Sequence, residues 1–350
     1  MLKSHFSHFS TTLNKKSIGF LPVGKEVFCY SLKNKNGVEL EIINFGATIT
    51  SLKIPNNKEE KVDVVLGFEN LENYVNSYNL SSEPYLGAIV GRYAGRINNA
   101  QFILNGKTIQ LTKNYNLHQI HGGFEGFSKV FWEVKSFTTN KSPSITLQYT
   151  SKDGEENFPG ELSVEVTYTL TEENELKVAI TAKSSEDTVV NLTQHSYFNL
   201  DGHSSDIINQ ELFVNSNKTL ETNIDNIPTG NFFEIKKTAF DFNFPKECPT
   251  KIDNTFVLNK QDEIAASLFS KKNKLKMSVF TNQPAVHIYV GGNCFNQIKG
   301  KGNVSYHPLS GICFEAQNFP DAPNHEHFPN SVLKKGELYH HNTTFKFEKL

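Results

Sequence analysis

The sequence contains no long hydrophobic run. Over its 350 residues, no stretch approaches the ~18 consecutive apolar residues that a membrane-spanning helix needs. The opening of the chain also lacks the apolar segment of ~7–15 residues that defines a secretory signal. We therefore expect a cytoplasmic protein that makes no contact with a membrane.

An excess of one charge is absent as well. The chain has 35 Lys and Arg residues against 37 Asp and Glu residues, and its formal charge is -2 at pH 7. Such a balance gives no electrostatic attraction to phosphate backbones or to anionic lipid surfaces. Nucleic acids and membranes are therefore not expected as partners, whereas a hydrophobic content of 37% is enough for a folded core.

Cysteine is scarce and scattered. The four residues, Cys29, Cys248, Cys294 and Cys313, form no CxxC pair. This spacing excludes the zinc-ribbon and thioredoxin patterns. We expect reduced thiols, as in a cytosolic protein.

Strand patterns dominate the chain. Residues 162–170 alternate between apolar and polar, and a polar turn separates them from an apolar run at 176–180, which predicts a hairpin. An Asn-Gly pair joins 102–104 to 107–111 and favours a type I′ turn. Further short strands are expected at 38–43, 62–66, 145–149, 286–290, 311–315 and 345–347.

Helical patterns are few. Residues 71–78 and 262–269 favour short helices, and no alternation of strand and helix appears, which excludes a doubly wound parallel sheet. We predict an all-β protein, a large antiparallel β-sandwich with few short helices. Residues 1–350 are expected to form one domain, with residues 1–24 as a loosely packed N-terminal arm.

A glycine- and arginine-rich motif occupies residues 91–97, with the sequence GRYAGRI. Its glycines permit close approach of the backbone, and Arg92 and Arg96 can donate hydrogen bonds to an oxygen-rich ligand. The alternative is a surface turn whose arginines are solvated.

Two histidines, His118 and His121, precede a Gly-Gly pair at 122–123. A sharp turn there would present the ring of His121 to a ligand, and the alternative is a structural loop histidine. A metal site needs three or four convergent ligands and no cysteine lies nearby, so we do not expect a metal at this motif.

A dense polar cluster at 191–199 follows an apolar strand pattern. His195 lies within it, and an imidazole with an unperturbed pKa of ~6.5 at the end of a rigid strand suits a proton carrier. The adjacent Ser196 is not expected to be a nucleophile, because the chain has no GxSxG motif and neighbours on a strand point to opposite faces.

The segment 311–322 contains a candidate general base. Alternation along a strand puts Cys313 and Glu315 on the face opposite to Ile312 and Phe314. A carboxylate at the end of an apolar strand is costly unless it is paired or used, and partial burial raises its pKa toward that of a useful base. Asp321 is a rival acid in the loop that follows.

The order of these motifs resembles that of the aldose 1-epimerase family, also called the galactose mutarotases. The matching stretches are 91–97, 117–123, 190–200, 252–258 and 314–322, followed by Lys-Gly-Glu at 335–337. The resemblance extends from about residue 25 to the end of the chain.

The resemblance implies a mutarotase-type sandwich and an isomerase that interconverts the α- and β-anomers of free hexoses such as galactose and glucose. No metal and no organic cofactor are implied, and the partner is a free monosaccharide. Glu315 is the implied general base and His195 the implied general acid. The implied sugar-binding residues are Arg96, His121, Tyr197, Asp253 and His287. We expect a monomer or a homodimer.

Three features depart from the family pattern. Gly95 stands where the family often has Asn, and His287 stands where it often has Gln. Extra residues also separate Leu117 from His121. These differences bear on the choice of sugar rather than on the chemistry, and the preferred sugar stays open.

Alternative functions remain at this point. An epimerase of phosphorylated hexoses would need a basic cluster beyond Arg92 and Arg96, and a carbohydrate-binding module would not need an acid–base pair. A glycoside hydrolase would use two carboxylates, for which Asp253 and Glu315 qualify, although Asp253 alone resembles a turn residue at the start of a strand.

Overall fold

The computed structural model describes residues 13–259, 263–291 and 297–350. Antiparallel strands make up most of this part of the chain, which confirms the all-β prediction. Its single α-helix is α1 (Leu71–Ser77), which Asn70 caps by accepting a hydrogen bond from the backbone N–H of Asn73. In the same described residues, no helix has the length and apolar character to cross a membrane.

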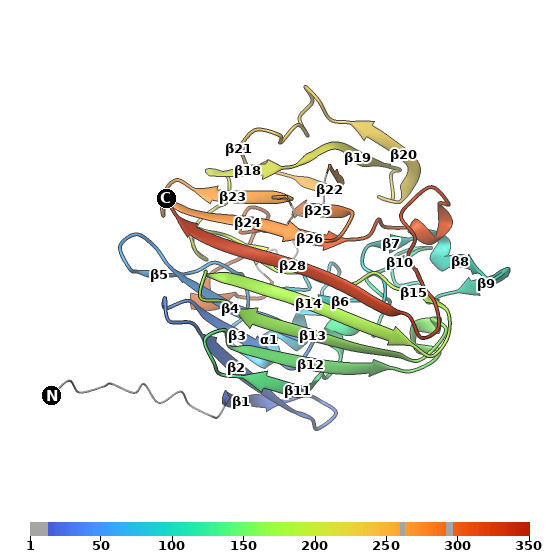
Figure 1. Cartoon of the computed structure of the whole chain (residues 1–350), viewed down its shortest axis with the longest axis horizontal. Helices are drawn as coiled ribbons and strands as arrows, with labels where there is room; N and C mark the ends of the chain where they lie inside the picture. Colours follow the sequence, from blue (N-terminus) through green and yellow to red (C-terminus); the bar gives the residue numbers. More distant parts are fainter. Residues whose placement is uncertain (1–12, 260–262, 292–296) are drawn as a thin grey trace.

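The largest sheet has nine strands and lies across the middle of the molecule (Figure 1). Its order is β11 (Glu133–Thr138), β12 (Ser144–Ser151), β13 (Leu162–Leu170), β14 (Glu175–Ser184), β28 (Leu338–Lys349), β24 (Leu275–Thr281), β23 (Ala266–Ser270), β18 (Gln210–Val214) and β21 (Lys246–Glu247). The long C-terminal strand β28 joins the two halves by pairing with both β14 and β24.

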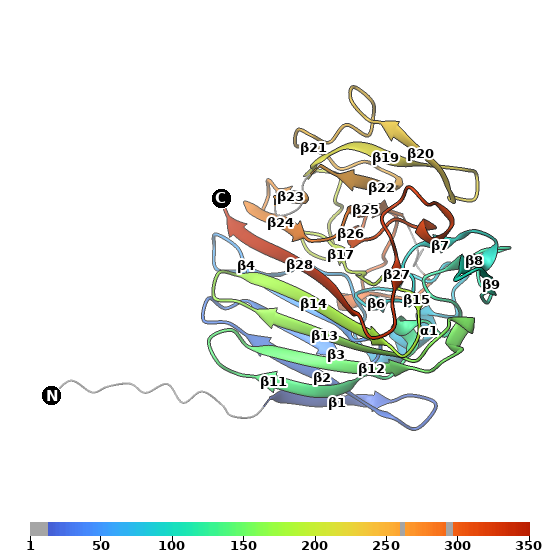
Figure 2. The ribbon, with the colours of Figure 1, turned by 45° about the vertical axis from the view of Figure 1, so that its right-hand side comes forward.

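Two further sheets complete the sandwich. The N-terminal sheet contains β1 (Asn14–Phe20), β2 (Glu26–Lys33), β3 (Glu39–Ile43), β4 (Thr48–Pro55) and β5 (Lys61–Asp63), and it lies beside β11–β14 in both views (Figures 1 and 2). The six-stranded sheet runs in the order β17 (Tyr197–Phe198), β26 (Ile312–Gln317), β25 (Ala285–Val290), β22 (Ile252–Leu258), β19 (Ser216–Thr222) and β20 (Pro228–Glu234).

Short strand pairs and single turns of 3-10 helix make up the rest of the regular structure. The pairs are β6 (Ile89–Val90) with β16 (Thr193–Gln194), β7 (Arg96–Ile97) with β10 (Gln119–Ile120), β8 (Gln101–Leu104) with β9 (Lys107–Gln110), and β15 (Thr188–Val189) with β27 (Val332–Leu333). The 3-10 turns are η1 (Asn98–Ala100), η2 (Phe127–Lys129), η3 (Glu155–Asn157), η4 (Lys301–Asn303) and η5 (Ala322–Asn324).

One hydrophobic cluster joins the three sheets. It takes Leu40 and Ile42 from β3, Val164 and Val166 from β13, and Phe314 from β26, all of which are buried. Alternate residues of β13 point into it, because successive side chains of a strand face opposite sides. The predicted hairpin of β13 and β14 is confirmed. So is the type I′ turn between β8 and β9, where Asn105 has φ 50° and Gly106 has φ 76°.

Two local predictions differ from the structure. The helix expected at 262–269 is wrong: Ala266–Ser270 is strand β23, and residue 262 itself lies outside the described residues. Pairing with β18 on one side and β24 on the other overrides the weak helical preference of this segment. Within the expected N-terminal arm, Asn14–Phe20 forms the edge strand β1 and pairs with β2, while residues 1–12 lie outside the described part.

Arg92 anchors the segment that carries the 91–97 motif. The side chain is buried, and its guanidinium donates to Ser151 Oγ at 2.8 Å and to the backbone carbonyls of Ser151, Lys152, Pro159 and Gly160. These five hydrogen bonds link the turn after β6 to the end of β12 and to the loop that precedes β13. Arg92 is therefore engaged within the protein, and neither of the two interpretations of this arginine, a ligand contact or a solvated surface turn, describes it.

Replacing Arg92 by Met tests this anchoring role. The substitution would remove the donor from four backbone carbonyls, two of which belong to the buried residues Ser151 and Gly160, and each buried carbonyl left unpaired costs about 1–3 kcal/mol. We expect the free energy of unfolding to fall by about 3 kcal/mol or more, measured by equilibrium unfolding in urea. Lys107→Met on the exposed strand β9 is the matched control, with a change of about 0.5 kcal/mol at most. Equal stability of the two variants would contradict the assignment.

Candidate active site

A polar pocket of about 340 Å³ opens where the six-stranded sheet meets the short pairs. This volume lies in the range of about 300–1,000 Å³ that small-molecule sites occupy. The side chains that face it from the motifs described above are Arg96, His121, His195, Asp253, His287 and Glu315. Segments more than 200 residues apart in the sequence thus meet in one cavity.

Glu315 lies on β26 at the floor of the pocket. Its neighbours Ile312 and Phe314 point into the main hydrophobic cluster, while Cys313 and Glu315 point to the other face, as the alternation predicted. The carboxylate side chain is only 3% exposed. A carboxylate in such a place needs compensating partners, because burial disfavours its charged form.

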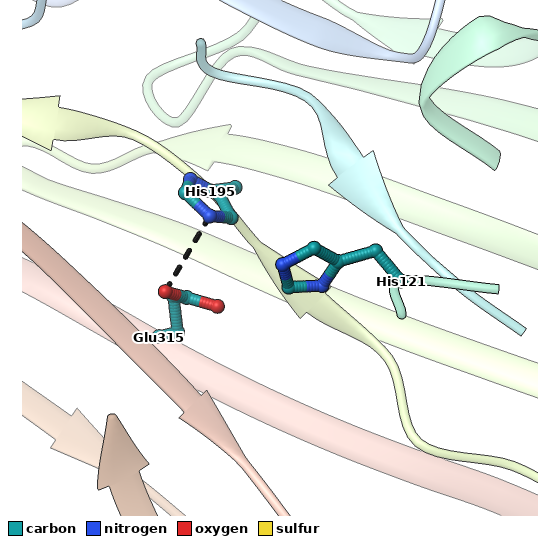
Figure 3. A group of neighbouring side chains, drawn as sticks. All are labelled: His121, His195 and Glu315. Atoms are coloured by element: carbon teal, nitrogen blue, oxygen red, sulfur yellow. Dashed lines mark ion pairs between the residues drawn. The ribbon is translucent and has the colours of Figure 1, made fainter. Parts of the chain in front are cut away.

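His195 supplies the nearest partner. It follows the short strand β16, and its Nε2 lies 3.4 Å from Glu315 Oε1 (Figure 3). On the other side of the ring, Nδ1 lies 3.7 Å from Cys313 Sγ. The rings of Tyr197 and Tyr85 pack against it, with centroids at 5.3 and 5.8 Å. The imidazole is thus fixed by packing and faces the carboxylate.

His121 enters from the turn after β10, beside the pair formed by His195 and Glu315 (Figure 3). The turn requires the glycine that follows, since a Cβ on Gly122 would lie 2.0 Å from the carbonyl oxygen of Gly91. The backbone N–H of Gly95 donates to His121 Nδ1 at 3.3 Å, which leaves Nε2–H as a donor. Burial, together with the charges of His195 and Arg96, holds the pKa of His121 well below its usual value. His121 therefore acts as a neutral donor.

Asp253 lies on β22 within a set of donors. His287 Nε2–H donates to its Oδ1 at 2.9 Å, the side-chain amide of Asn226 donates to its Oδ2 at 3.3 Å, and Arg96 lies 3.5 Å from Oδ2. Burial alone would raise the pKa of Asp253. The hydrogen bond from His287 and the charges of His287 and Arg96 outweigh burial and hold the pKa below its usual value. Asp253 is therefore a stable anion.

Three side chains of the pocket also offer the ligand atoms that a metal would need. His121, His195 and Glu315 place theirs within 4.8 Å of one another. Two imidazoles and one carboxylate are a donor set that zinc accepts in proteins. The same three groups, without an ion, provide a neutral donor, a titratable imidazole and a buried carboxylate, so either use of the cluster is chemically coherent.

Not every predicted residue reaches the pocket. Tyr197 is buried behind His195 and packs edge-to-face on Tyr289, with ring centroids 6.1 Å apart. His118 is buried away from the cavity, where its Nδ1 accepts from the backbone N–H of Asn99. Asp321 accepts from the backbone N–H of Asn98 in the loop after β26.

Sequence reasoning missed several side chains that line the pocket, and Tyr85, Asn226, Tyr289 and Gln317 are among them. Two of them could have been found, since Tyr289 and Gln317 follow His287 and Glu315 by two positions on strands and so share their faces. Tyr85 and Asn226 lie on loops, where no periodicity indicates direction.

Comparisons with known proteins agree with this arrangement. The sequence model of the family described as aldose 1-epimerase matches residues 29–346. The galactose mutarotase of Bos taurus is 37% identical over 347 residues, which cover 96% of this chain and 98% of that protein. The aldose 1-epimerase of Haemophilus influenzae is 35% identical and covers 93% and 97%. The crystal structure of galactose 1-epimerase from Lactobacillus acidophilus superposes with a TM-score of 0.84 at 27% identity, covering 97% of this chain and 99% of that one.

Proposed function

The chain belongs to the aldose 1-epimerase family, and we propose that its pocket interconverts the α- and β-anomers of free hexoses such as galactose and glucose with Glu315 as general base and His195 as general acid. Membership of this family makes the protein an isomerase. The residue roles rest on the geometry of the pocket.

Ring opening defines what the site has to do. One group removes the proton from the anomeric hydroxyl O1, and another protonates the ring oxygen O5 as the C1–O5 bond breaks. Rotation about C1–C2 then exposes the other face of the carbonyl, and the two groups exchange roles when the ring closes. The net reaction consumes no cofactor, since one proton is taken up and one is returned.

The single observation that carries the assignment is the buried pair of His195 Nε2 and Glu315 Oε1 at 3.4 Å. O1 and O5 are bonded to the same carbon, so an acid and a base that serve both atoms have to lie close together. Both side chains are held by strands or packed rings, which keeps them aligned for proton transfer. A carboxylate beside an imidazole fits an acid–base pair better than the two carboxylates of a glycoside hydrolase.

The remaining polar groups suit the hydroxyls of a neutral sugar. His121 offers a donor, Asp253 offers acceptors, and Arg96 offers donors that are partly shared with Asp253. Within the described residues that line the pocket, Arg96 is the only Lys or Arg. A phosphorylated hexose brings a dianion, which would call for a richer cluster of cations. Tyr197 supports His195 from behind, and a contact with the sugar is not part of this proposal.

Three finer assignments complete the proposal. The whole chain acts as one domain, as a monomer or a homodimer. We infer a cytoplasmic location, which the free thiols of Cys29, Cys248 and Cys313 support. The substrate is a free monosaccharide, and polarimetry of freshly dissolved α-D-galactose and α-D-glucose, with and without the protein, measures its turnover. Unchanged decay of optical rotation with folded protein would contradict the function.

Glu315→Gln tests the base. The amide keeps the shape of the side chain but cannot take up the proton, so we expect turnover to fall by ~10²-fold or more while sugar binding changes little. The polarimetric rate gives turnover, and calorimetric titration gives binding. Glu133→Gln on the exposed face of β11 is the matched control. Turnover at the wild-type rate would show that another group is the base.

His195→Asn tests the acid in the same assay. The amide side chain does not titrate near neutral pH, so it cannot exchange a proton with the ring oxygen, and we expect a loss of ~10²-fold or more in turnover. His340→Asn, at an exposed position of β28, is the control and should retain wild-type turnover. An equal effect of the two substitutions would remove His195 from the mechanism.

Chelation separates the acid–base mechanism from metal catalysis. Because Glu315 and His195 can complete both proton transfers, we expect dialysis against EDTA to leave the polarimetric rate unchanged. The cluster of His121, His195 and Glu315 makes the experiment informative. A rate that falls on dialysis and returns with added Zn²⁺ would assign the cluster to a metal instead.

A further inference from the structure

His287 has both ring nitrogens engaged by the protein. Nε2 lies 2.9 Å from Asp253 Oδ1, and Nδ1 lies 2.8 Å from Thr255 Oγ1. An imidazole has two hydrogen-bonding atoms, and both are occupied here in either charge state. The ring therefore lines the pocket without a hydrogen-bonding group left for a sugar, although the sequence comparison with the family placed it among the sugar contacts.

The register of three neighbouring strands produces this arrangement. Thr255 on β22 pairs with His287 on β25, and His287 pairs with Glu315 on β26. Directly paired residues point to the same face of a sheet, so the three side chains form one row, of which His287 and Glu315 line the pocket. Asp253 lies two positions before Thr255 on the same strand and shares that face.

The direction of each hydrogen bond follows from chemistry. A carboxylate only accepts, so His287 Nε2–H donates to Asp253. In the neutral ring, Nδ1 accepts from the hydroxyl of Thr255. In the protonated ring, Nδ1–H donates to the same oxygen, because a hydroxyl can do either. The chain from Thr255 through His287 to Asp253 thus persists when His287 changes its charge.

We propose that His287 is a positioning residue, which holds the carboxylate of Asp253 toward the sugar through the chain Thr255–His287–Asp253. It acts on the substrate through Asp253 rather than by its own contact. This inference rests on the proposed function, because Asp253 is a sugar-binding residue only if the pocket binds a sugar.

Asp253 keeps acceptor capacity for the sugar in this arrangement. Oδ1 receives one hydrogen bond from His287, and Oδ2 receives one from Asn226 with Arg96 nearby. Each carboxylate oxygen can accept about two hydrogen bonds, so lone pairs remain free. With the carboxylate held on both oxygens, little rotational freedom is lost when a hydroxyl binds, which favours affinity.

Charged and titratable groups face His287 from the elements packed against it. Asp253 faces it from β22, Glu315 from β26, Arg96 from β7, and His121 from the turn after β10. Burial lowers the pKa of His287, but the hydrogen bond to Asp253 and the charges of Glu315 and Asp253 raise it more, so the pKa lies above its usual value. The carboxylates of Asp253 and Glu315 therefore favour the charged form of His287, which keeps Nε2–H as a donor to Asp253.

A double-mutant cycle distinguishes positioning from direct contact. His287→Leu removes the donor to Asp253 and should raise KM for galactose about tenfold with a smaller change in kcat, measured by polarimetry. Asp253→Asn should also raise KM. If His287 acts through Asp253, adding His287→Leu to Asp253→Asn should change KM by no more than about twofold. Fully additive effects would mean an independent contact with the sugar and would overturn the proposal.

His287→Gln separates the donor from the charge. Its amide can still donate to Asp253, so KM should stay within about threefold of wild type. The variant carries no charge at any pH, so a retained KM would show that the hydrogen bond to Asp253, and not the charge of residue 287, positions the carboxylate. Thr255→Val should reproduce part of the His287→Leu effect and Thr255→Ser should restore wild-type values. A KM raised in His287→Gln as far as in His287→Leu would contradict the positioning role of this hydrogen bond.

An NMR measurement that does not depend on turnover distinguishes the positioning role of His287 from the proposed function. Imidazole resonances followed by NMR should include one that titrates above pH 6.5, that disappears in His287→Gln and that shifts to a lower pKa in Asp253→Asn. That result would hold even if the protein failed to accelerate mutarotation, in which case only the proposed function would fall. A His287 resonance unaffected by Asp253→Asn would overturn the positioning chain itself.

Discussion

The pocket depends on keeping two carboxylates charged inside the protein. An isolated buried carboxylate would take up a proton, since burial penalises its charged form by several kcal/mol. Glu315 has His195 beside it, and Asp253 has His287, Arg96 and Asn226. Removing His287 or Arg96 would raise the pKa of Asp253, and with it weaken the ability of this carboxylate to accept hydrogen bonds from hydroxyls.

Backbone pairing fixes where these partners stand. The row of Thr255, His287 and Glu315 exists because β22, β25 and β26 are adjacent and in register, and a slip of one residue would turn every one of these side chains to the opposite face. The other half of the pocket comes from turns. Arg92 anchors the turn that precedes Arg96, and a glycine at 122 lets the turn that presents His121 pass close to the Gly91 carbonyl. Sheet register and anchored turns together hold the site without a ligand.

The sequence predicted the parts of this site that depend on local periodicity. Alternation along 311–315 correctly predicted the face of the strand on which Glu315 lies. The polar motif at 191–199 indicated His195, which is the partner of Glu315. Local patterns could not distinguish Arg92 from Arg96, because both lie in one motif. Only the tertiary structure shows that the guanidinium of Arg92 donates to backbone carbonyls. For the same reason Asp253 alone resembled a turn residue, and 262–269 favoured a helix although two neighbouring strands pair with Ala266–Ser270. Tyr197 was expected among the sugar contacts only from the resemblance to the family. A single sequence does not show which distant residues become neighbours in the fold.

Three histidines in one pocket illustrate how environment assigns different roles to one side chain. His121 accepts a backbone N–H at Nδ1 and lies near cations, so it stays neutral and can only donate through Nε2. His287 lies between two carboxylates, which favour its charged form. His195 faces Glu315 on one side and a buried thiol on the other, so its Nε2 is the ring atom that faces both the base and the cavity. Glu315 exchanges one of the two protons of the reaction, and the other requires an imidazole that can both give and take up a proton. The separation of the three environments leaves that part to His195.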